Sequence, residues 1–286
     1  MDHGAPELSA LEPWVYEPLL ALALREDIGS GDLTTEALIS PEARLEGVFV
    51  AKGSGRIAGL EVAAHVFRRL DPGVRTEPLV QDGADVDAGT PLMRVRGRGR
   101  ALLSGERVAL NLLMRLSGIA TATRDVVRLV QDLPVKIADT RKTMPLLRAL
   151  DKYAVRVGGG VNHRFGLYDA VLIKDNHIAA VGSIREAVRR ARRRAGYLIP
   201  IEVEIERLED VEEALEAGVT AILLDNMPLP MLREAVRIVN RRAITEASGG
   251  ITPQNVRAVA ETGVDVISLG WLTHSVRAMD ISFELE

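Results

Sequence analysis

The second half of the chain alternates short apolar, β-prone runs with helical patterns, and no other feature restricts the possible folds as strongly. Strand and helix in alternation build right-handed βα units around a parallel sheet. Between several of the runs lie segments rich in Glu, Arg and Ala, such as 183–195 and 208–218. About seven such units predict a closed or nearly closed α/β barrel in preference to an open, doubly wound sheet. The apolar runs occupy residues 135–139, 153–159, 170–175, 200–205, 220–225, 243–248 and 265–270.

The first hundred residues lack this alternation and predict a small α+β domain. Beyond them, residues 104–133 form one long helical pattern, for which Ser104 is the expected N-cap. The Arg run at 189–194 is interpreted as the solvated face of an outer helix. The elements expected in the first hundred residues are a short helix at 18–25, a polar, glycine-punctuated turn at 26–38, a hairpin of two strands at 46–59, an amphipathic helix at 60–70, and a strand, turn and strand at 80–97.

Polar residues recur where the apolar runs end, and the carboxyl ends of barrel strands face one common mouth. A lone Arg usually lies on a solvated surface, but cations that recur at strand ends predict a ligand with several negative charges. Cations dominate the first three units, carboxylates the next two and Gly-rich turns the last two. In chain order these residues are Asp139, Thr140, Arg141, Lys142, 158–160, His163, Arg164, Lys174, Glu204, Asp225, Ser248, Gly249, Gly250 and Gly270.

The cations differ in the groups that they can bind. Arg141 and Arg164 offer planar forks suited to bidentate carboxylate binding. Lys142 and Lys174 are point charges better suited to phosphate oxygens or to a polarised carboxylate. His163 is either an acid/base group or a neutral donor, and both readings stay open.

The Gly-rich turns suit a phosphate group. Ser248 and two glycines precede Thr252, a good N-cap, and Pro253, which fits the first position of a helix. Backbone N–H groups at such a loop and helix start bind phosphate, and barrels often bind it after their last strands. Each glycine alone is more often a simple turn residue, so the prediction of a phosphate site rests on the loop with Gly249 and Gly250 and on Gly270 together.

Glu204 and Asp225 are the last carboxylates of two adjacent predicted strands. Two carboxylates beside a phosphate suit Mg²⁺, which completes its octahedron with water and phosphate oxygens. The alternative is a structural hydrogen bond to a barrel Lys or Arg. The sequence therefore predicts a pocket for a small polycarboxylate together with a phosphorylated, Mg²⁺-bound partner.

Composition excludes several other classes of function. The net charge is −4 and only 3% of residues are aromatic, so neither nucleic acid nor a membrane surface is expected as a partner. No window reaches the roughly 18 to 20 uninterrupted apolar residues of a membrane span. The chain has no Cys, and residues 1–14 lack the profile of a secretory signal, so a cytoplasmic location is expected.

At these same residues the sequence resembles the quinolinate phosphoribosyltransferase family. The likeness extends over most of the chain, and its long central block is highly specific to the family. The segments that carry it are EDIGSGDLTT, SGERVALNLLMRLSGIAT, ADTRKTMPLLRALDKYAVRVGGGVNHRFGLYDAVLIKDNHI, IEVEIE, AILLDN, ASGGI and ISLGWLTHS.

The resemblance implies an incomplete seven-stranded α/β barrel with a smaller N-terminal α/β sandwich domain. The sandwich would cover residues 1–116 together with the C-terminal tail 272–286, and the barrel would cover 117–271. Family members work as homodimers or higher assemblies in which the sandwich of one subunit covers the barrel mouth of another. Arg107, otherwise an ordinary surface residue, would then reach the partner's quinolinate.

The resemblance also implies roles for the strand-end residues. Quinolinate and phosphoribosyl pyrophosphate are the expected substrates, with Mg²⁺ as cofactor. The residues expected to be catalytic are Lys142, Lys174, Glu204 and Asp225, the last two also as metal ligands. The expected substrate-binding residues are Arg107, Thr140, Arg141, His163, Arg164, Lys174, Ser248, Gly249, Gly250 and Gly270. One departure is Trp271, a larger residue than the family commonly has there, which is expected to reshape the phosphate loop.

Two rival interpretations remain. One is a related protein with another acceptor, such as a molybdenum-transport-associated homologue or a nicotinate-type phosphoribosyltransferase; Arg141, Arg164 and Lys174 favour an acceptor with two carboxylates over nicotinate, which has one. The other is a non-catalytic phosphate-ligand binding protein or carrier, because 80–97 resembles a biotin- or lipoyl-carrier hairpin. The turn there contains no Lys for cofactor attachment, and this argues against a carrier.

Overall fold

The computed structural model describes residues 11–286, so most of the segment 1–14 considered for a signal lies outside the described residues. The chain divides into two compact units. Unit 1 comprises the residues up to Arg124, Thr143–Gly159 and Leu272–Glu286, and unit 2 comprises Asp125–Lys142 and Gly160–Trp271. Among the described residues, no helix combines the length and the apolar content that crossing a membrane requires.

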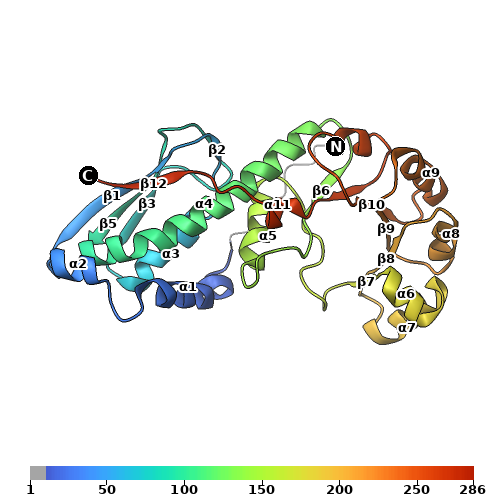
Figure 1. Ribbon diagram of the computed structural model, residues 1–286, viewed down its shortest axis with the longest axis horizontal. Helices are drawn as coiled ribbons and strands as arrows, with labels where there is room; N and C mark the ends of the chain where they lie inside the picture. Colours follow the sequence, from blue (N-terminus) through green and yellow to red (C-terminus); the bar gives the residue numbers. More distant parts are fainter. Residues whose placement is uncertain (1–10) are drawn as a thin grey trace. The chain divides into compact units, whose positions relative to one another are not determined.

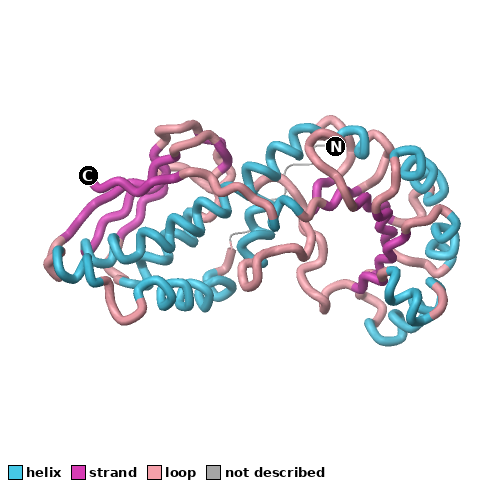
Figure 2. Tube along the Cα trace, viewed as in Figure 1, coloured by secondary structure: helices cyan, strands magenta, loops and turns pink. Residues whose placement is uncertain are grey.

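Unit 1 contains a four-stranded antiparallel sheet of order β12-β1-β5-β3 and a separate pair, β2-β4 (Figure 2). The C-terminal strand β12 thus joins a sheet made from the first hundred residues. The elements of this unit are α1 (Pro13–Ile28), α2 (Leu33–Leu38), β1 (Arg44–Ala51), β2 (Gly55–Arg56), α3 (Leu60–Leu70), β3 (Arg75–Pro78), β4 (Asp85–Val86), β5 (Pro91–Arg98), most of α4 (Gly99–Leu129), α5 (Arg148–Val157) and β12 (Ile281–Leu285).

The core of unit 1 follows from the alternation of apolar residues along β1. Phe49 on β1 is fully buried, and its ring lies 5.9 Å from that of Phe67 on α3 and 4.9 Å from that of Phe283 on β12. Burying a Phe side chain stabilises a fold by roughly 1.5 to 3 kcal/mol. These aromatic contacts therefore help to fasten the C-terminal strand and α3 to the same sheet.

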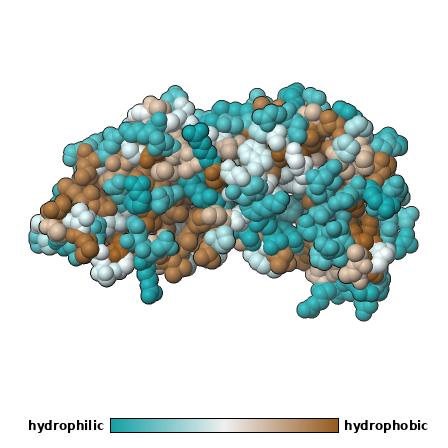
Figure 3. All heavy atoms as spheres, in the orientation of Figure 1, coloured by the Kyte–Doolittle hydropathy of each residue, from teal (hydrophilic) through white to brown (hydrophobic). Residues whose placement is uncertain are grey.

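The surface of unit 1 carries exposed hydrophobic residues on its first two helices. Trp14 and Leu22 of α1 are 75% and 55% exposed, and Leu33 and Leu38 of α2 are 85% and 76% exposed. Figure 3 shows hydrophobic residues, in brown, on the visible face of this unit. Large apolar side chains gathered on a surface are typical of places where another protein packs.

Two local predictions in this region were wrong. The strands within 46–59 do not form a hairpin, because β1 pairs with β12 and β5 while β2 pairs with β4. The strand, turn and strand predicted at 80–97 are present as β4 and β5, which pair with other strands and not with each other. Part of the predicted turn at 26–38 is helix α2, whose N-cap Asp32 accepts a hydrogen bond from the backbone N–H of Thr35.

The long helix α4 begins at Gly99, so Ser104 is not its N-cap. It runs past residue 116, where the domain boundary was expected, and the two units divide eight residues later, between Arg124 and Asp125. A continuous helix offers no break in chain direction, which is why the sequence gives no signal for this division. At Gly118 an added Cβ would lie 2.3 Å from the backbone oxygen of Arg277, so glycine lets the C-terminal segment approach the helix closely.

Unit 2 is built on a six-stranded parallel sheet of order β6-β11-β10-β9-β8-β7. Figure 1 shows helices α7, α8 and α9 on the outer side of the strands, as expected for βα units. Its elements are the end of α4, β6 (Lys136–Ala138), β7 (Val171–Ile173), α6 (Asp175–Val181), α7 (Ile184–Ala195), β8 (Ile201–Ile205), α8 (Glu209–Glu216), β9 (Ala221–Asp225), α9 (Leu229–Val239), β10 (Ile244–Ser248), α10 (Val256–Ala260), β11 (Val266–Ser268) and the first residue of α11 (Trp271–His274). The predicted α/β class with a barrel-like parallel sheet is confirmed, and six of the seven predicted strands are present.

The seventh prediction was wrong, because residues 153–159 fall mainly in helix α5 of unit 1. Tyr153, Val155 and Val157 are all buried there, and no residue of α5 is exposed, so the helix lacks the exposed polar face of a surface helix. A short apolar run of this kind cannot be told from a buried strand by its periodicity. Just beyond the predicted strand, Val161 forms a single parallel bridge to Ala138 of β6.

Candidate active site

A cavity of about 390 Å³ opens among side chains at or near the carboxyl ends of the strands of unit 2. This volume lies within the range of small-molecule sites, and in α/β barrels ligands bind at this end of the strands. Leu172, Leu223, Glu246 and Ser268 are part of the lining. The other lining residues are nine that the sequence singled out: Thr140, Arg141, Lys142, His163, Arg164, Lys174, Glu204, Asp225 and Ser248.

Four of the expected site residues are not among those that line the cavity. Gly249 and Gly250 follow Ser248 in the loop after β10, and Gly270 lies between β11 and α11. Arg107 lies on α4 in unit 1, with its side chain 60% exposed and one ion pair to Glu106 at 3.9 Å. The structure therefore gathers the cations and carboxylates at one cavity, with Arg107 as the exception.

Two guanidinium groups form the strongly positive part of the cavity wall. The pKa of Arg164 lies below its ordinary value, because burial disfavours its charge and because Arg141 adds a like charge nearby. Nη1 of Arg164 donates to the carbonyl of Ala170 at 2.9 Å. Among the described residues, no atom accepts a hydrogen bond from its buried Nε. Paired arginines with a buried donor still to be satisfied suit an anionic ligand.

The loop that carries His163 and Arg164 is anchored by Asp139 at the end of β6. Asp139 is fully buried, and its carboxylate accepts hydrogen bonds from the backbone N–H of His163 at 2.9 Å and from the amide of Asn162 at 2.6 Å. Hydrogen bonds to a buried carboxylate are stronger than those between neutral groups. They fix the backbone at the residues that face the cavity.

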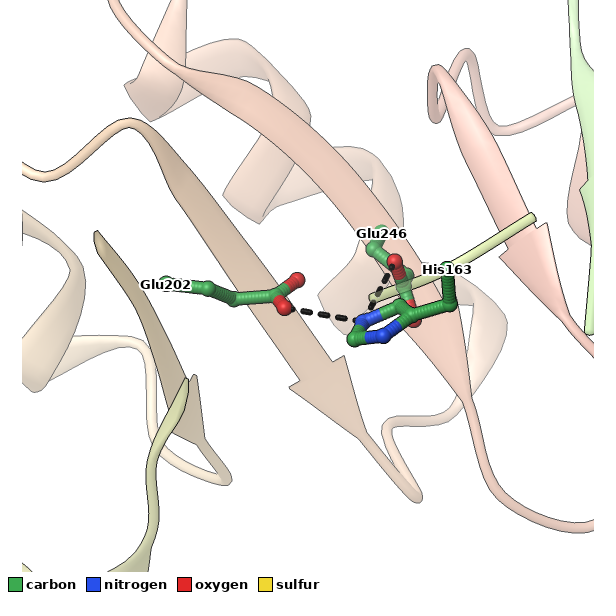
Figure 4. Close-up of side chains that lie close together, drawn as sticks. All are labelled: His163, Glu202 and Glu246. Atoms are coloured by element: carbon green, nitrogen blue, oxygen red, sulfur yellow. Dashed lines mark hydrogen bonds and ion pairs between the residues drawn. The ribbon is translucent and has the colours of Figure 1, made fainter. Parts of the chain in front are cut away.

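Sequence reasoning missed two carboxylates that meet the ring of His163 (Figure 4). Oε2 of Glu202 on β8 lies 2.9 Å from Nε2 of His163, and Oε2 of Glu246 on β10 lies 3.6 Å from the same nitrogen. Burial raises the pKa of Glu246 to about 7, and the charge of Glu202 adds to this effect. The missed signal was the alternation in IEVEI, which points Glu202 and Glu204 to the same face of the strand.

A second group of charges lies at the ends of β8 and β9. Nζ of Lys174 lies 2.5 Å from Oε2 of Glu204. The pKa of Asp225 is raised above its ordinary value, first by burial and then by the charge of Glu204, whereas Lys174 lowers it. Two carboxylates that affect each other in this way, beside a cavity, form a donor set that fits a hard divalent cation.

The loop after β10 has the glycine-dependent shape expected of a phosphate loop. Gly249 has φ +91°, and an added Cβ would lie 2.2 Å from Oδ1 of Asn226, so no other residue fits there without movement. Nε1 of Trp271 donates to the carbonyl of Ile251 at 3.0 Å, so this residue ties the loop to α11. The expectation that a helix begins at Thr252 and Pro253 was wrong, because Asn255 is the N-cap of α10.

Comparison with protein families gives two adjacent matches that together cover most of the chain. Residues 32–117 match the model described as "Quinolinate phosphoribosyl transferase, N-terminal domain". Residues 119–284 match the model of the C-terminal domain of the same name. The two matches meet within α4, close to the division between the two units.

Individual proteins show the same likeness along the whole chain. The chain is 50% identical over 260 residues to the "Probable nicotinate-nucleotide pyrophosphorylase [carboxylating]" of Bacillus subtilis, covering 91% of this chain and 90% of that protein. The corresponding protein of Mycobacterium leprae is 47% identical over 92% of this chain and 94% of its own length. Among solved structures, NadC from Streptococcus pyogenes superposes with a TM-score of 0.94 at 42% identity, covering 97% of this chain and 99% of that one.

Proposed function

Because the chain belongs to the quinolinate phosphoribosyltransferase family, we infer that it transfers the phosphoribosyl group of phosphoribosyl pyrophosphate to quinolinate with loss of CO₂. The enzyme is a pentosyltransferase with the carboxylating nicotinate-nucleotide pyrophosphorylase activity. Its products are nicotinate mononucleotide, pyrophosphate and CO₂, a step of NAD biosynthesis. The observation that carries this function is a cavity lined by two arginines, Arg141 and Arg164, and three carboxylates, Glu204, Asp225 and Glu246.

We assign the quinolinate site to Arg141, His163, Arg164 and Lys174. Quinolinate carries two adjacent carboxylates, and the two guanidinium forks suit bidentate contacts with them. The buried Nε of Arg164 would gain an acceptor when the dicarboxylate binds. Held at both carboxylates, the ring nitrogen can be aimed at C1 of the ribose, which is a positioning effect on the rate.

We assign the phosphoribosyl pyrophosphate site to other residues of the cavity and to the glycine-containing loops after β10 and β11. Thr140 and Lys142 would contact the pyrophosphate, and Ser248, Gly249, Gly250 and Gly270 would surround the ribose phosphate. Glu204 and Asp225 would hold Mg²⁺, and their position at the cavity and their mutual electrostatic effect fit that role. When bound, the ion neutralises charge on the pyrophosphate and orients it.

The residues act mainly through electrostatics. The ring nitrogen forms a bond to C1 as the bond from C1 to pyrophosphate breaks, and Lys142 stabilises the negative charge that leaves. A carboxylate near the sugar, Glu204, favours the positive charge that develops on the ribose. The bond from C2 of the ring to its carboxylate then breaks to release CO₂, the electron pair stays on C2, where the adjacent cationic ring nitrogen stabilises it, and this pair takes up a proton. No covalent enzyme intermediate is needed.

We propose that the enzyme is a homodimer or a higher assembly in which Arg107 serves the partner's quinolinate site. Its side chain is 60% exposed and does not line the cavity of its own unit 2. The exposed hydrophobic residues of α1 and α2 give unit 1 a surface suited to packing against another subunit. We also propose a cytoplasmic location, since a chain without Cys needs no oxidising compartment to fold.

One assay tests the function against its rivals. Release of pyrophosphate and of ¹⁴CO₂ from carboxyl-labelled quinolinate should occur together and in equal amounts, and both should require Mg²⁺. Nicotinate as acceptor should release neither product. Turnover of nicotinate without quinolinate turnover would instead assign the chain to the nicotinate-type rival, and no release with either acceptor would favour a binding protein.

A further inference from the structure

The cluster of His163, Glu202 and Glu246 lies at the wall of the acceptor cavity and is not explained by sugar-phosphate binding (Figure 4). Its three ligand atoms all lie within 4.8 Å of one another. Glu202 and Glu246 are only 9% and 5% exposed. His163 and Glu246 line the cavity, whereas Glu202 is not part of the lining and meets the ring from the protein side. Two buried carboxylates therefore converge on one ring nitrogen.

When both carboxylates are ionised, this arrangement requires a cation. Two buried, ionised carboxylates repel each other, and a neutral imidazole between them supplies no compensating charge. A proton on the ring makes it an imidazolium and supplies that charge. Because the pKa of Glu246 is raised to about 7, this carboxyl is itself protonated at lower pH, and the imidazolium is needed once Glu246 is ionised.

A divalent metal ion is the other cation that three such groups could hold. The surroundings speak against it. Glu202 already interacts electrostatically with Arg164, which in turn lies close enough to Arg141 to have its pKa lowered. A doubly charged ion beside two guanidinium groups meets more repulsion than a single proton does.

The hydrogen bonding of the ring leads to the same protonation state. Nε2 lies 2.9 Å from Oε2 of Glu202, and an ionised carboxylate can only accept a hydrogen bond, so Nε2 carries a proton. A hydrogen bond from the ring to a ligand carboxylate would then come from Nδ1. Both nitrogens carry protons only in the imidazolium, because the neutral tautomer with a proton on Nε2 presents a lone pair at Nδ1, which repels a carboxylate.

We propose that Glu202 and Glu246 are positioning residues that keep the imidazole of His163 protonated at the wall of the acceptor pocket, where it faces the dicarboxylate as a further cation beside Arg141 and Arg164. The protonation of His163 follows from the cluster alone. That the imidazolium of His163 binds a substrate carboxylate rests on the proposed function.

Some charged groups around His163 favour its protonated form, and others oppose it. Those that favour its charge are Glu202 on β8, Glu246 on β10 and Asp139 after β6, which holds the backbone N–H of His163. Those that oppose it are the guanidinium groups of Arg164, next to it in the loop, and Arg141. The carboxylates outnumber the guanidinium groups, and two of them lie within 3.6 Å of the ring. The charges around the ring therefore favour the protonated form of His163.

The protonation state can be measured without any assay of activity. The chain has five His residues, so the imidazole ¹⁵N signals of His163 can be assigned in the full-length protein by their absence in a His163→Gln variant. In the wild type His163 should remain protonated at pH 7.5. In Glu202→Gln its titration midpoint should fall by about one pH unit or more, and in Glu246→Gln by a smaller amount. Glu234→Gln removes a carboxylate on α9 that pairs with Arg237, and it should leave the midpoint unchanged.

A neutral His163 at pH 7.5 in the wild type would overturn the proposal, and this measurement needs no variant to fold. The same midpoint in a folded Glu202→Gln protein would overturn it too. So would stoichiometric binding of added Zn²⁺ that broadens the His163 signals in the wild type and is lost in Glu202→Gln, because the cation would then be a metal.

Calorimetric titration with quinolinate separates this proposal from the proposed function. In Glu202→Gln, affinity for quinolinate at pH 8 should fall about tenfold and should recover at pH 6, where His163 regains its proton from solvent. A loss of affinity equal at both pH values would mean that Glu202 is only structural. If the wild type did not bind quinolinate while His163 stayed protonated, the proposed function would fail and the charge state of the cluster would stand.

Discussion

The ammonium of Lys174 at the end of β7 lies 2.5 Å from Oε2 of Glu204 at the end of β8. A cation assigned to the acceptor site therefore touches a carboxylate assigned to the metal site. Because Glu204 can face either Lys174 or a metal ion, occupation of the two parts of the cavity should be linked. An ion pair that neutralises Glu204 also weakens its attraction for Mg²⁺.

We therefore expect Lys174→Met to have opposite effects on the two ligands. The KM for quinolinate should rise about tenfold or more, since one carboxylate loses a charged partner. The Mg²⁺ concentration that gives half-maximal activity should fall, because Glu204 no longer has a competing cation. Steady-state kinetics with each component varied in turn tests both. Lys52→Met, which breaks a surface ion pair to Glu284, is the matched control. An unchanged Mg²⁺ requirement would contradict the linkage.

Removing either guanidinium fork should weaken acceptor binding selectively. Arg141→Ala or Arg164→Ala should cost about 2 to 4 kcal/mol of quinolinate binding, a loss of about thirtyfold to several hundredfold, because a buried carboxylate loses a bidentate partner. The KM for phosphoribosyl pyrophosphate should change little. Arg193→Ala, on the exposed part of α7, serves as the control. Unchanged quinolinate affinity in both variants would refute the assignment of these arginines.

The sequence predicted most of unit 2 because its strands are short apolar runs bounded by polar turns. Each of the runs at β8, β9 and β10 has a helical pattern after it, and this combination has few structural solutions. The nine predicted residues that line the cavity followed from the same rule, since the ends of parallel strands meet at one edge. The local sequence pattern therefore predicted the strands of unit 2 and the residues at their ends.

Pairings that depend on distant segments were not predictable in this way. The pairing of β1 with β12 joins residues more than two hundred positions apart, and no local signal specifies it. Helix α5 was mistaken for a strand because its burial in unit 1 leaves it no exposed face. Glu202 and Glu246 were overlooked because each stands inside an apolar run, although a buried carboxylate there requires a partner across the sheet.

Breaking the buried ion pair between Arg115 and Asp151 by removing one partner should strongly destabilise unit 1. Nε and Nη2 of Arg115 donate to the two carboxylate oxygens of Asp151 at 2.9 and 2.8 Å, and Asp151 is fully buried. Arg115→Met should lower the free energy of unfolding by about 3 to 5 kcal/mol, because it leaves a buried carboxylate without its cation. Urea denaturation measures this. Arg115→Met combined with Asp151→Leu should recover part of the loss, and a single variant as stable as the wild type would contradict the prediction.

Glu246 should make the stability depend on pH in a defined window. Its pKa is raised by burial and by Glu202, from 4.5 when unfolded to about 7 in the fold. An acid with a raised pKa stabilises the fold below its unfolded pKa, and this contribution is lost as pH rises through the folded value. The wild type should therefore lose stability relative to Glu246→Gln between about pH 4.5 and 7, as followed by thermal unfolding of both proteins in the same buffers. Parallel curves for the two proteins would contradict the shift.

Arg107 provides the test of the proposed assembly. Its side chain is 60% exposed on α4 and does not line the cavity of its own unit 2, so its proposed role requires another subunit. In a dimer with two shared sites, Arg107→Ala and Arg141→Ala should each be nearly inactive alone. A mixed dimer would contain one site that lacks both residues and one site that is intact. Random exchange of equal amounts should therefore restore about a quarter of the wild-type activity, since half of the dimers are mixed and each has one working site.

Subunit exchange must be verified separately, for example by native mass spectrometry of subunits carrying different isotope labels. If mixed dimers form and activity stays absent, Arg107 does not act across the interface. If Arg107→Ala alone keeps full activity, it has no role in the reaction. Mixing Arg141→Ala with Arg164→Ala is the internal control, because both residues line the same cavity. That mixture should remain inactive, since one site of every mixed dimer lacks Arg141 and the other lacks Arg164.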